Sequence, residues 1–287
     1  MTITFEPTGA ALGARVHGVS LAETPDAATV EAVEAGLERY GVLIFPDQDI
    51  TPGQQVAFSA ALGPLIPTNN LDARLDGHPE IFVVGKVGEK IVSFAPKDDP
   101  ADLEWHADHM HLEETARASM LYARIVPPEG GDTLFSCMYA AHDALSPEER
   151  AAFAELRAIH SVSGLRRFLA TAGEAETAEG RYASDLELAV RWPLVRHHPR
   201  SGRPSLYFGS KVTIGIEGWS EADARALIGR LARAAARPER IYRHVWSVGD
   251  AVLWDNRRTL HAATPADLRR YDRVMHRTTF KETAPIR

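Results

Sequence analysis

The chain has 287 residues, of which 45% are hydrophobic, and this is enough to bury one sizeable core. A formal net charge of −7, with acidic and basic residues mixed along the chain, argues against nucleic acid as a partner. No apolar run approaches the roughly 20 residues needed to span a bilayer, which argues against a membrane protein. The single cysteine, Cys137, excludes an internal disulfide, and the N-terminus lacks a secretory signal, so we expect a cytoplasmic protein.

The chain is expected to form one domain over residues 1–287, because no repeat, low-complexity tract or Pro/Gly/Ser-rich linker divides it. Apolar residues at helical spacing predict a first helix over residues 27–40. After Gly41, the short apolar run 42–45 is typical of a buried strand, and Pro46 ends it.

Two further helices are predicted from their capping signals. Ser146, followed by a proline and a capping-box glutamate, precedes a helix over residues 151–158. Ser220 introduces a second helix that extends to about Ala236. We expect these helices to form outer layers of the fold.

Short runs with the composition of β-strands lie between and around these helices. In chain order they are 119–125, 133–136, 194–198, 206–208, 241–246, 251–254 and 273–280. Many short strands separated by Gly and Pro favour a sandwich or barrel over a parallel sheet. The sequence therefore predicts a mainly β fold with flanking helices, a double-stranded β-helix (jelly roll, cupin-like). The alternative is an α+β fold with an open antiparallel sheet.

A metal site is indicated by His106, Asp108 and the distant His261. In an extended segment, side chains two residues apart share a face, so His106 and Asp108 point the same way while Trp105 and Ala107 point the other. Two imidazoles and one carboxylate on one face of an octahedral ion leave three positions open, as in Fe(II) oxygenases. We therefore expect an Fe(II) oxygenase.

Residues near this motif have competing interpretations. His109 and His111 follow closely, so a zinc hydrolase with one of them as a ligand is an alternative, although the other histidines show no repeated ligand spacing. Trp254, like Trp105, is expected to be a packing wall. Asp255 and Asn256 are expected to fix the turn before His261.

Two arginines follow the distal histidine. If residues 273–280 form a strand, Arg273 and Arg277 share a face and both guanidinium groups point into the interior, which implies anionic ligands. The alternative is that both face outward and pair with neighbouring acids such as Asp272 and Glu282. Thr133, after the turn at residues 130–132, adds a hydroxyl donor.

In combination and order, these motifs resemble the taurine dioxygenase and 2,4-dichlorophenoxyacetate dioxygenase family of Fe(II)- and 2-oxoglutarate-dependent enzymes. The resemblance covers nearly the whole chain, through segments 13–21, 42–48, 105–108, 127–133, 254–257, His261 and 273–277. It implies a jelly-roll dioxygenase that uses Fe(II), 2-oxoglutarate and O2, and that releases succinate and CO2. Relatives are commonly dimers or tetramers, so a homo-oligomer is expected.

The resemblance also implies roles for individual residues. It assigns the iron to His106, Asp108 and His261, and the distal carboxylate of 2-oxoglutarate to Thr133 and Arg273. Arg277 matches the arginine that binds the acidic group of the prime substrate, which is therefore expected to be a small anionic organic molecule.

The substrate branch is indicated by segments 191–196, 201–203 and 206–209, which look closest to the phenoxyalkanoate-degrading enzymes. Taurine fits less well, because the histidine and tyrosine that follow the corresponding glycine in taurine dioxygenase are missing after Gly63. Asp102 also stands where the taurine enzyme has an asparagine. A phenoxyalkanoate-like acid is the expected substrate and a sulfonate or sulfate the alternative. A non-catalytic jelly-roll binding module is a further alternative.

Overall fold

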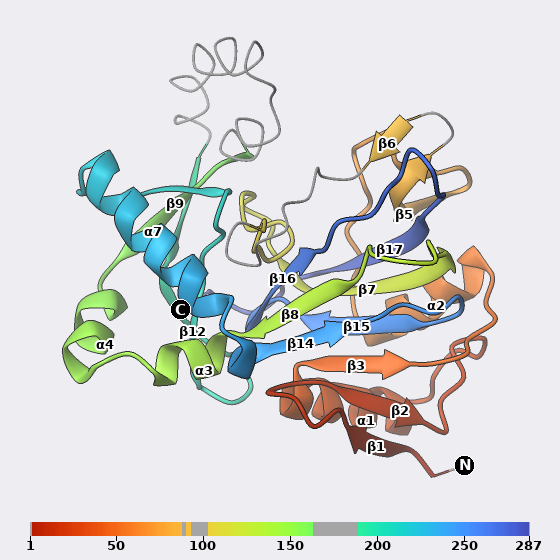
Figure 1. The fold of residues 1–287 in the computed structure, drawn as a ribbon. Helices are drawn as coiled ribbons and strands as arrows, with labels where there is room; N and C mark the ends of the chain where they lie inside the picture. Colours follow the sequence, from red (N-terminus) through yellow and green to blue (C-terminus); the bar gives the residue numbers. More distant parts are fainter. Residues whose placement is uncertain (1, 88–89, 93–102, 163–188, 287) are drawn as a thin grey trace.

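The computed structural model describes residues 2–87, 90–92, 103–162 and 189–286. Most of its strands belong to one large sheet, which crosses the molecule in Figure 1. In spatial order this sheet contains β1 (Thr4–Pro7), β2 (Ala14–His17), β3 (Val42–Phe45), β15 (Ala251–Asp255), β7 (Ala116–Ile125), β17 (Val274–Lys281), β5 (His78–Val87) and β4 (Arg74–Leu75). β6 (Lys90–Val92) pairs with β5.

A smaller sheet faces the large one and closes the β-structure. It consists of β14 (Ile241–His244), β8 (Thr133–Cys137) and β16 (Thr259–Ala263). Phe135 of β8 packs on Trp254 of β15, with ring centroids 5.5 Å apart, and Leu121 and Met275 belong to the same buried cluster. Apolar side chains from the two sheets therefore fill the space between them, as expected for a double-sheet fold. The prediction of a mainly β jelly roll with flanking helices is confirmed.

Helices α1 (Ala27–Tyr40) and α2 (Pro52–Leu62) cover the outer face of the large sheet. Leu37 and Phe58 from these helices lie in one buried cluster with Phe280 of β17. Gly41 ends α1 in the left-handed conformation, at φ 74°, and directs the chain into β3. The predicted boundaries of α1 and β3 are confirmed.

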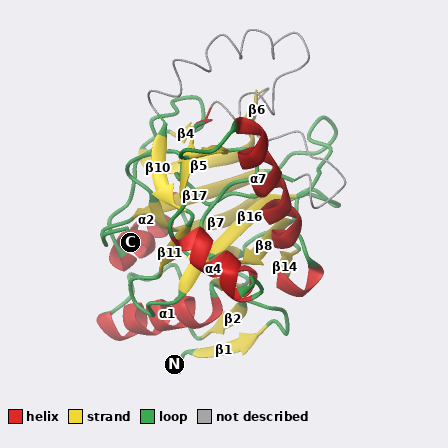
Figure 2. Cartoon of the chain, turned by 90° about the vertical axis from the view of Figure 1, so that its left-hand side faces the viewer, coloured by secondary structure: helices red, strands yellow, loops and turns green. Residues whose placement is uncertain are grey.

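A helical layer with two small sheets covers the other side of the molecule, and Figure 2 shows α4 and α7 lying in front of the β-structure. The helices are α3 (Met138–Asp143), α4 (Pro147–Ala154), α7 (Glu221–Ala235) and the 3-10 helix η2 (Pro238–Arg240). The small sheets are β10 (Val190–Pro193), β9 (Arg157–His160) and β13 (Thr213–Ile216), and β11 (Val195–His197) with β12 (Pro204–Leu206).

Some predicted boundaries are wrong. The helix expected to reach Ala158 ends at Ala154, because residues 157–160 form β9 and pair with both β10 and β13. The strand expected at 206–208 instead occupies residues 204–206. α2 was not predicted, although Thr51 and Gln54 form a capping box at its start. Apolar periodicity alone therefore did not predict these elements: β9 depends on long-range strand pairing, and α2 begins at a local capping box.

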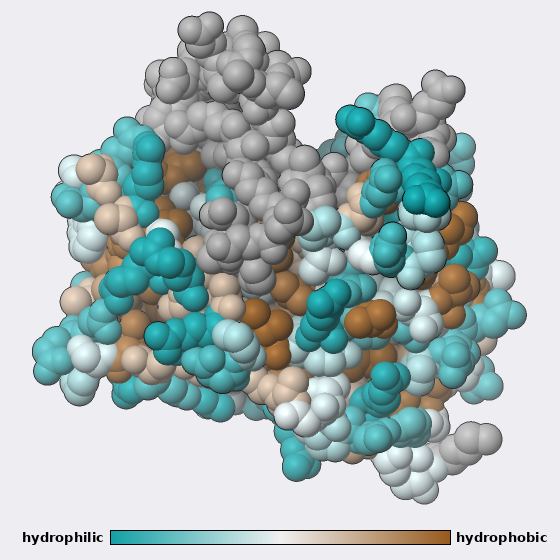
Figure 3. Space-filling view, in the orientation of Figure 1, coloured by the Kyte–Doolittle hydropathy of each residue, from teal (hydrophilic) through white to brown (hydrophobic). Residues whose placement is uncertain are grey.

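The described residues include a few large apolar side chains that are exposed, among them Leu71, Trp219 and Val245. On the face drawn in Figure 3, hydrophilic residues predominate and no single apolar area dominates. None of the helices in the described ranges combines the length and the apolar character needed to cross a bilayer.

Candidate metal centre

The structure brings His106, Asp108 and His261 together. His106 and His261 form an isolated antiparallel bridge, in which the backbone N–H of each donates to the carbonyl of the other at 3.1 and 2.8 Å. One potential ligand atom from each of the three side chains lies within 4.8 Å of the others. The bridge therefore joins the extended segment around His106 to β16, so that residues about 150 positions apart share one site.

Asp108 and His261 have pKa values that favour metal binding. Burial, and then the neighbouring His106, lower the pKa of His261 to about 3, so its imidazole is neutral at ordinary pH. Burial alone would raise the pKa of Asp108, but Arg277 and the two imidazoles hold it well below its usual range. The ring Nδ1 of His106 lies 2.9 Å from the carbonyl of Glu104, which leaves its Nε2 available. Two imidazoles and one carboxylate are a ligand set that fits an Fe(II) ion.

Ser119 and Asn256 hold Asp108 in place. Ser119 Oγ donates to Asp108 Oδ2 at 2.6 Å, and Asn256 Nδ2 donates to Ser119 Oγ at 3.0 Å. Asn256 Oδ1 also accepts from the backbone N–H of Asp108 and from the indole of Trp254. Such partners of ligating carboxylates commonly set their orientation. Ser119 was not predicted from the sequence, because its contact with Asp108 forms only when β7 lies beside the segment that carries Asp108.

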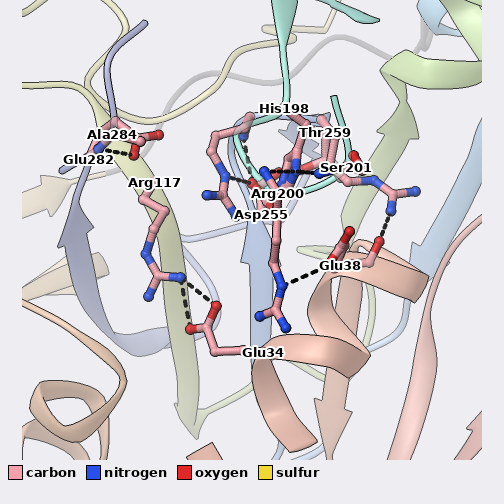
Figure 4. Close-up of polar contacts among 12 residues, drawn as sticks. Glu34, Glu38, Arg117, His198, Arg200, Ser201, Asp255, Thr259, Glu282 and Ala284 are labelled. Atoms are coloured by element: carbon pink, nitrogen blue, oxygen red, sulfur yellow. Dashed lines mark hydrogen bonds and ion pairs between the residues drawn. The ribbon is translucent and has the colours of Figure 1, made fainter. Parts of the chain in front are cut away.

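The turn before His261 is held by a buried ionic network, part of which appears in Figure 4. Asp255 lies 2.9 Å from the imidazole of His198, and Arg257 donates to the same carboxylate at 2.8 and 2.7 Å. Burial by itself would raise the pKa of Asp255, but Arg257 and His198 hold it far below its usual range. Thr259 Oγ1 donates to the Asp255 carbonyl. Asp255 therefore fixes this turn, while Asn256 also supports Asp108.

Arg277 lies beside the metal centre. It projects from β17 on the same face of the sheet as its cross-strand partner Phe82 of β5, with its guanidinium carbon 4.9 Å from the Phe82 ring centroid. Its Nη1 lies 2.5 Å from Asp108 Oδ1. The alternative that Arg277 faces outward is therefore wrong.

Arg273 is buried, and its hydrogen bonds go to a backbone carbonyl. It immediately precedes β17, and its Nε and Nη2 donate to the carbonyl of Gly131 at 3.3 and 3.1 Å. No ion pair of Arg273 occurs among the residues that the structure describes. Burial lowers its pKa to about 10, against a weaker opposite effect of Asp132. A buried guanidinium with only a carbonyl acceptor is costly, so this site fits an anionic ligand.

Gly131 and Thr133 lie next to the Arg273 guanidinium or one turn away from it. Gly131 has φ 71°, and a Cβ there would lie 3.1 Å from Arg273 Nε, so glycine permits the close approach. Thr133, two residues further on, is buried, and its Oγ1 accepts from the indole of Trp246 at 3.0 Å. The structure thus places both residues predicted for the cosubstrate carboxylate around one turn.

Beside Arg277 lies a cavity of about 200 Å³. It is lined by Ile66, Thr68, Glu80, Phe82, His109, His111, Leu112, Arg277 and Thr279. Among the described residues, the one group of three possible ligands suited to a metal is His106, Asp108 and His261, without His109 or His111. Burial and the neighbouring Arg277 lower the pKa of His109. His109 and His111 therefore line a cavity next to the centre instead of completing a zinc site.

Residues 4–279 match the model of the family described as taurine catabolism dioxygenase TauD, TfdA family. This chain belongs to that family. Members of the TauD/TfdA family use Fe(II), 2-oxoglutarate and O2, and the chain is an Fe(II)- and 2-oxoglutarate-dependent dioxygenase. This confirms the predicted family, reaction class and cofactors.

Individual relatives of this TauD/TfdA chain have different substrates. It is 37% identical to an (S)-phenoxypropionate/alpha-ketoglutarate-dioxygenase of Sphingobium herbicidovorans, over 91% of this chain and 89% of the relative. It is 30% identical to an alpha-ketoglutarate-dependent sulfate ester dioxygenase of Pseudomonas putida, over 100% of this chain and 92% of the relative. A crystal structure of a taurine dioxygenase from Burkholderia xenovorans superimposes with a TM-score of 0.82 at 31% identity, over 99% of this chain and 91% of the other.

Proposed function

We propose that His106, Asp108 and His261 hold the catalytic Fe(II). The observation that carries this proposal is the convergence of two imidazoles and one ionised carboxylate, with ligand atoms within 4.8 Å of one another. Iron held by three protein ligands, together with 2-oxoglutarate and O2, supplies the oxidation of a C–H bond while 2-oxoglutarate becomes succinate and CO2. Ser119 and Asn256 keep Asp108 oriented toward the ion.

Arg273 and Thr133 are the proposed binding residues for the distal carboxylate of 2-oxoglutarate. Nε and Nη2 of the buried guanidinium both donate to the carbonyl of Gly131. Its other N–H groups can donate to a carboxylate, whose two oxygens match the planar fork of an arginine. The Thr133 hydroxyl accepts from Trp246, so its own proton is free to be donated to that carboxylate. These contacts would fix the cosubstrate in one orientation.

Arg277 is the proposed binding residue for the acidic group of the prime substrate. It is the cation of the cavity beside the metal centre, so it can hold an anionic molecule with a C–H bond near the iron. A phenoxyalkanoate-like carboxylic acid is the favoured substrate, supported by the phenoxypropionate relative. An alkyl sulfate or related sulfonate is the second candidate, supported by the sulfate ester relative.

The walls of the site are aromatic. Trp254 and Phe135 lie next to His261, with centroid distances of 4.8 and 6.2 Å, and Trp105 is fully buried next to His106 in sequence. Apolar walls exclude water from the imidazole side of the site and strengthen the charge interactions within it. The residues thus bind, orient and desolvate the reactants.

The test is O2-dependent formation of succinate from 2-oxoglutarate, measured with a panel of phenoxyalkanoates, alkyl sulfates and sulfonates. Succinate formation stimulated by one of these acids, and lost in His106→Ala but kept in a control His197→Ala, supports the proposal. His197 is exposed on β11. A zinc hydrolase would act on its substrate without O2, and a non-catalytic binding module would bind an acid without producing succinate.

We propose a single domain over residues 1–287, a cytoplasmic location and a homo-oligomer, either dimer or tetramer. The sedimentation behaviour of the purified protein tests the last of these.

A further inference from the structure

Two residues that line the cavity beside the metal centre each have a buried nitrogen atom with no hydrogen-bond partner among the described residues. These atoms are Nε of Arg277 and Nδ1 of His109. A buried polar nitrogen without a partner costs free energy, so a site that keeps two of them in one cavity indicates a missing acceptor. Arg277 Nη1 already contacts Asp108, which leaves the rest of its guanidinium for another acceptor.

His109, which lines this cavity, has an unusual backbone conformation. Its φ is 55°, and together with Asp47 it is one of two non-glycine residues with positive φ in the described ranges. Its carbonyl accepts from the N–H of Leu112, which closes a turn immediately after Asp108. Backbone strain of this kind is concentrated at ligand sites.

The same cavity contains one carboxylate. Glu80 lies two residues before Phe82 on β5, and Phe82 pairs with Arg277, so Glu80 is a diagonal neighbour of Arg277 across the two strands. Diagonal neighbours of this kind are about 7–8 Å apart. A ligand that places one negative charge on Arg277 is accommodated, whereas a second negative charge would meet Glu80 and be repelled.

We propose that His109 is a specificity-determining residue, which donates a hydrogen bond from Nδ1 to the acidic group that Arg277 also binds, and that Glu80 restricts the substrate to monoanions. The inference rests on the proposed function, since it concerns the same substrate. It names the substrate class as small organic monoanions, carboxylates or sulfates, and it disfavours dianions such as phosphonates.

The experiment measures binding without turnover. Protein loaded with Mn(II) and the unreactive cosubstrate analogue N-oxalylglycine is titrated calorimetrically with phenoxyacetate, (S)-2-phenoxypropionate and hexyl sulfate. The Kd of the acid that binds wild type most tightly should rise about 10-fold or more in His109→Gly, because a hydrogen bond to a charged group is lost. His109→Asn, which tolerates positive φ and keeps an amide donor, should stay within about 3-fold of wild type.

The controls separate backbone effects from side-chain effects. Asp47→Gly relaxes the other strained residue, which is exposed at φ 54°, and should leave the Kd unchanged. Phenoxymethylphosphonate should bind wild type more weakly than phenoxyacetate does. In Glu80→Gln, the ratio of the two Kd values should fall at least about 3-fold. The Kd of N-oxalylglycine should be the same in all variants.

Each outcome decides a separate claim. Failure of wild type to bind N-oxalylglycine would count against the proposed function itself. If N-oxalylglycine binds but no monoanion binds, or if His109→Gly binds the acid as wild type does, the role of His109 is overturned. If the phosphonate binds as tightly as the carboxylate, the role of Glu80 is overturned.

Discussion

The hydroxyl of Ser119 donates a 2.6 Å hydrogen bond to Oδ2 of Asp108, and both side chains are buried. Asn256 in turn donates to Ser119, so strand β7 and the turn before β16 both hold the carboxylate of the metal centre. Because the bond lies away from solvent, water cannot readily replace it.

Ser119→Ala should therefore weaken iron binding. Partners of metal ligands typically contribute about 10- to 100-fold in affinity, and we expect a loss at the lower end because Arg277 still contacts Asp108. The check is anaerobic Fe(II) titration of the apoprotein. Ser136→Ala, which removes an equally buried hydroxyl bound to the carbonyl of Ala235, should leave iron affinity unchanged. Equal losses in both variants would show a general effect on the fold.

Arg273→Lys should raise the Kd for 2-oxoglutarate about 10-fold or more, even though the charge is kept. A lysine ammonium lacks the planar fork that matches a carboxylate, so the 2-oxoglutarate carboxylate would lose one of its two hydrogen bonds in a buried site. Equilibrium binding of 2-oxoglutarate to the iron-loaded protein measures the change. Arg243 is near the same turn, since it forms an ion pair with Asp132, but its side chain is largely exposed. The control variant Arg243→Lys should therefore bind 2-oxoglutarate like wild type. An unchanged Kd in Arg273→Lys would remove Arg273 from the cosubstrate site.

Thr133→Val should affect both stability and cosubstrate binding. The substitution leaves the indole N–H of Trp246 without its acceptor, which costs about 1–3 kcal/mol of unfolding free energy. It also removes the donor proposed for 2-oxoglutarate. Urea denaturation and 2-oxoglutarate binding give the two values, and Thr133→Ser should restore both. A loss of stability with normal 2-oxoglutarate binding would restrict Thr133 to a structural role.

The apoprotein should lose stability as pH falls below about 6.5. Burial, and then its positively charged neighbours, lower the pKa of His160 to about 3, so between these pH values the unfolded chain binds a proton that the native protein rejects. Stability therefore rises with pH across this window. In His160→Asn, the slope of unfolding free energy with pH should be smaller by up to about 1.4 kcal/mol per pH unit.

Urea denaturation at several pH values checks this expectation. At about pH 8, a histidine at this position is neutral in both states, so wild type and His160→Asn should show the same slope. Equal slopes at pH 5 as well would mean that His160 is not kept neutral by burial.

The metal centre was predictable because two of its three ligands lie close together in the sequence and only one is distant. Period-two spacing puts His106 and Asp108 on one face, and only a three-dimensional pairing was needed to bring His261 to them. The roles of Ser119 and of the His198–Asp255 pair were not predictable, because each depends on a partner from another element.

The helical layer shows a different limit. α2 has small residues in place of a clear apolar stripe, so periodicity misses it although its capping box is visible in the sequence. Residues 157–158 were predicted as the end of a helix, whereas they belong to β9, whose neighbours on both sides, β10 and β13, come from much later in the chain. The secondary structure of residues 157–160 is therefore set by strand pairing with distant segments.

The most direct test of the account is anaerobic titration of the apoprotein with Fe(II) and 2-oxoglutarate, followed by visible absorption. We expect a metal-to-ligand charge-transfer band in wild type, and its loss in Asp108→Ala and in Arg273→Ala at the same 2-oxoglutarate concentration. Absence of the band in wild type, together with tight binding of zinc at the same residues, would contradict the assignment of Fe(II) and 2-oxoglutarate to this site.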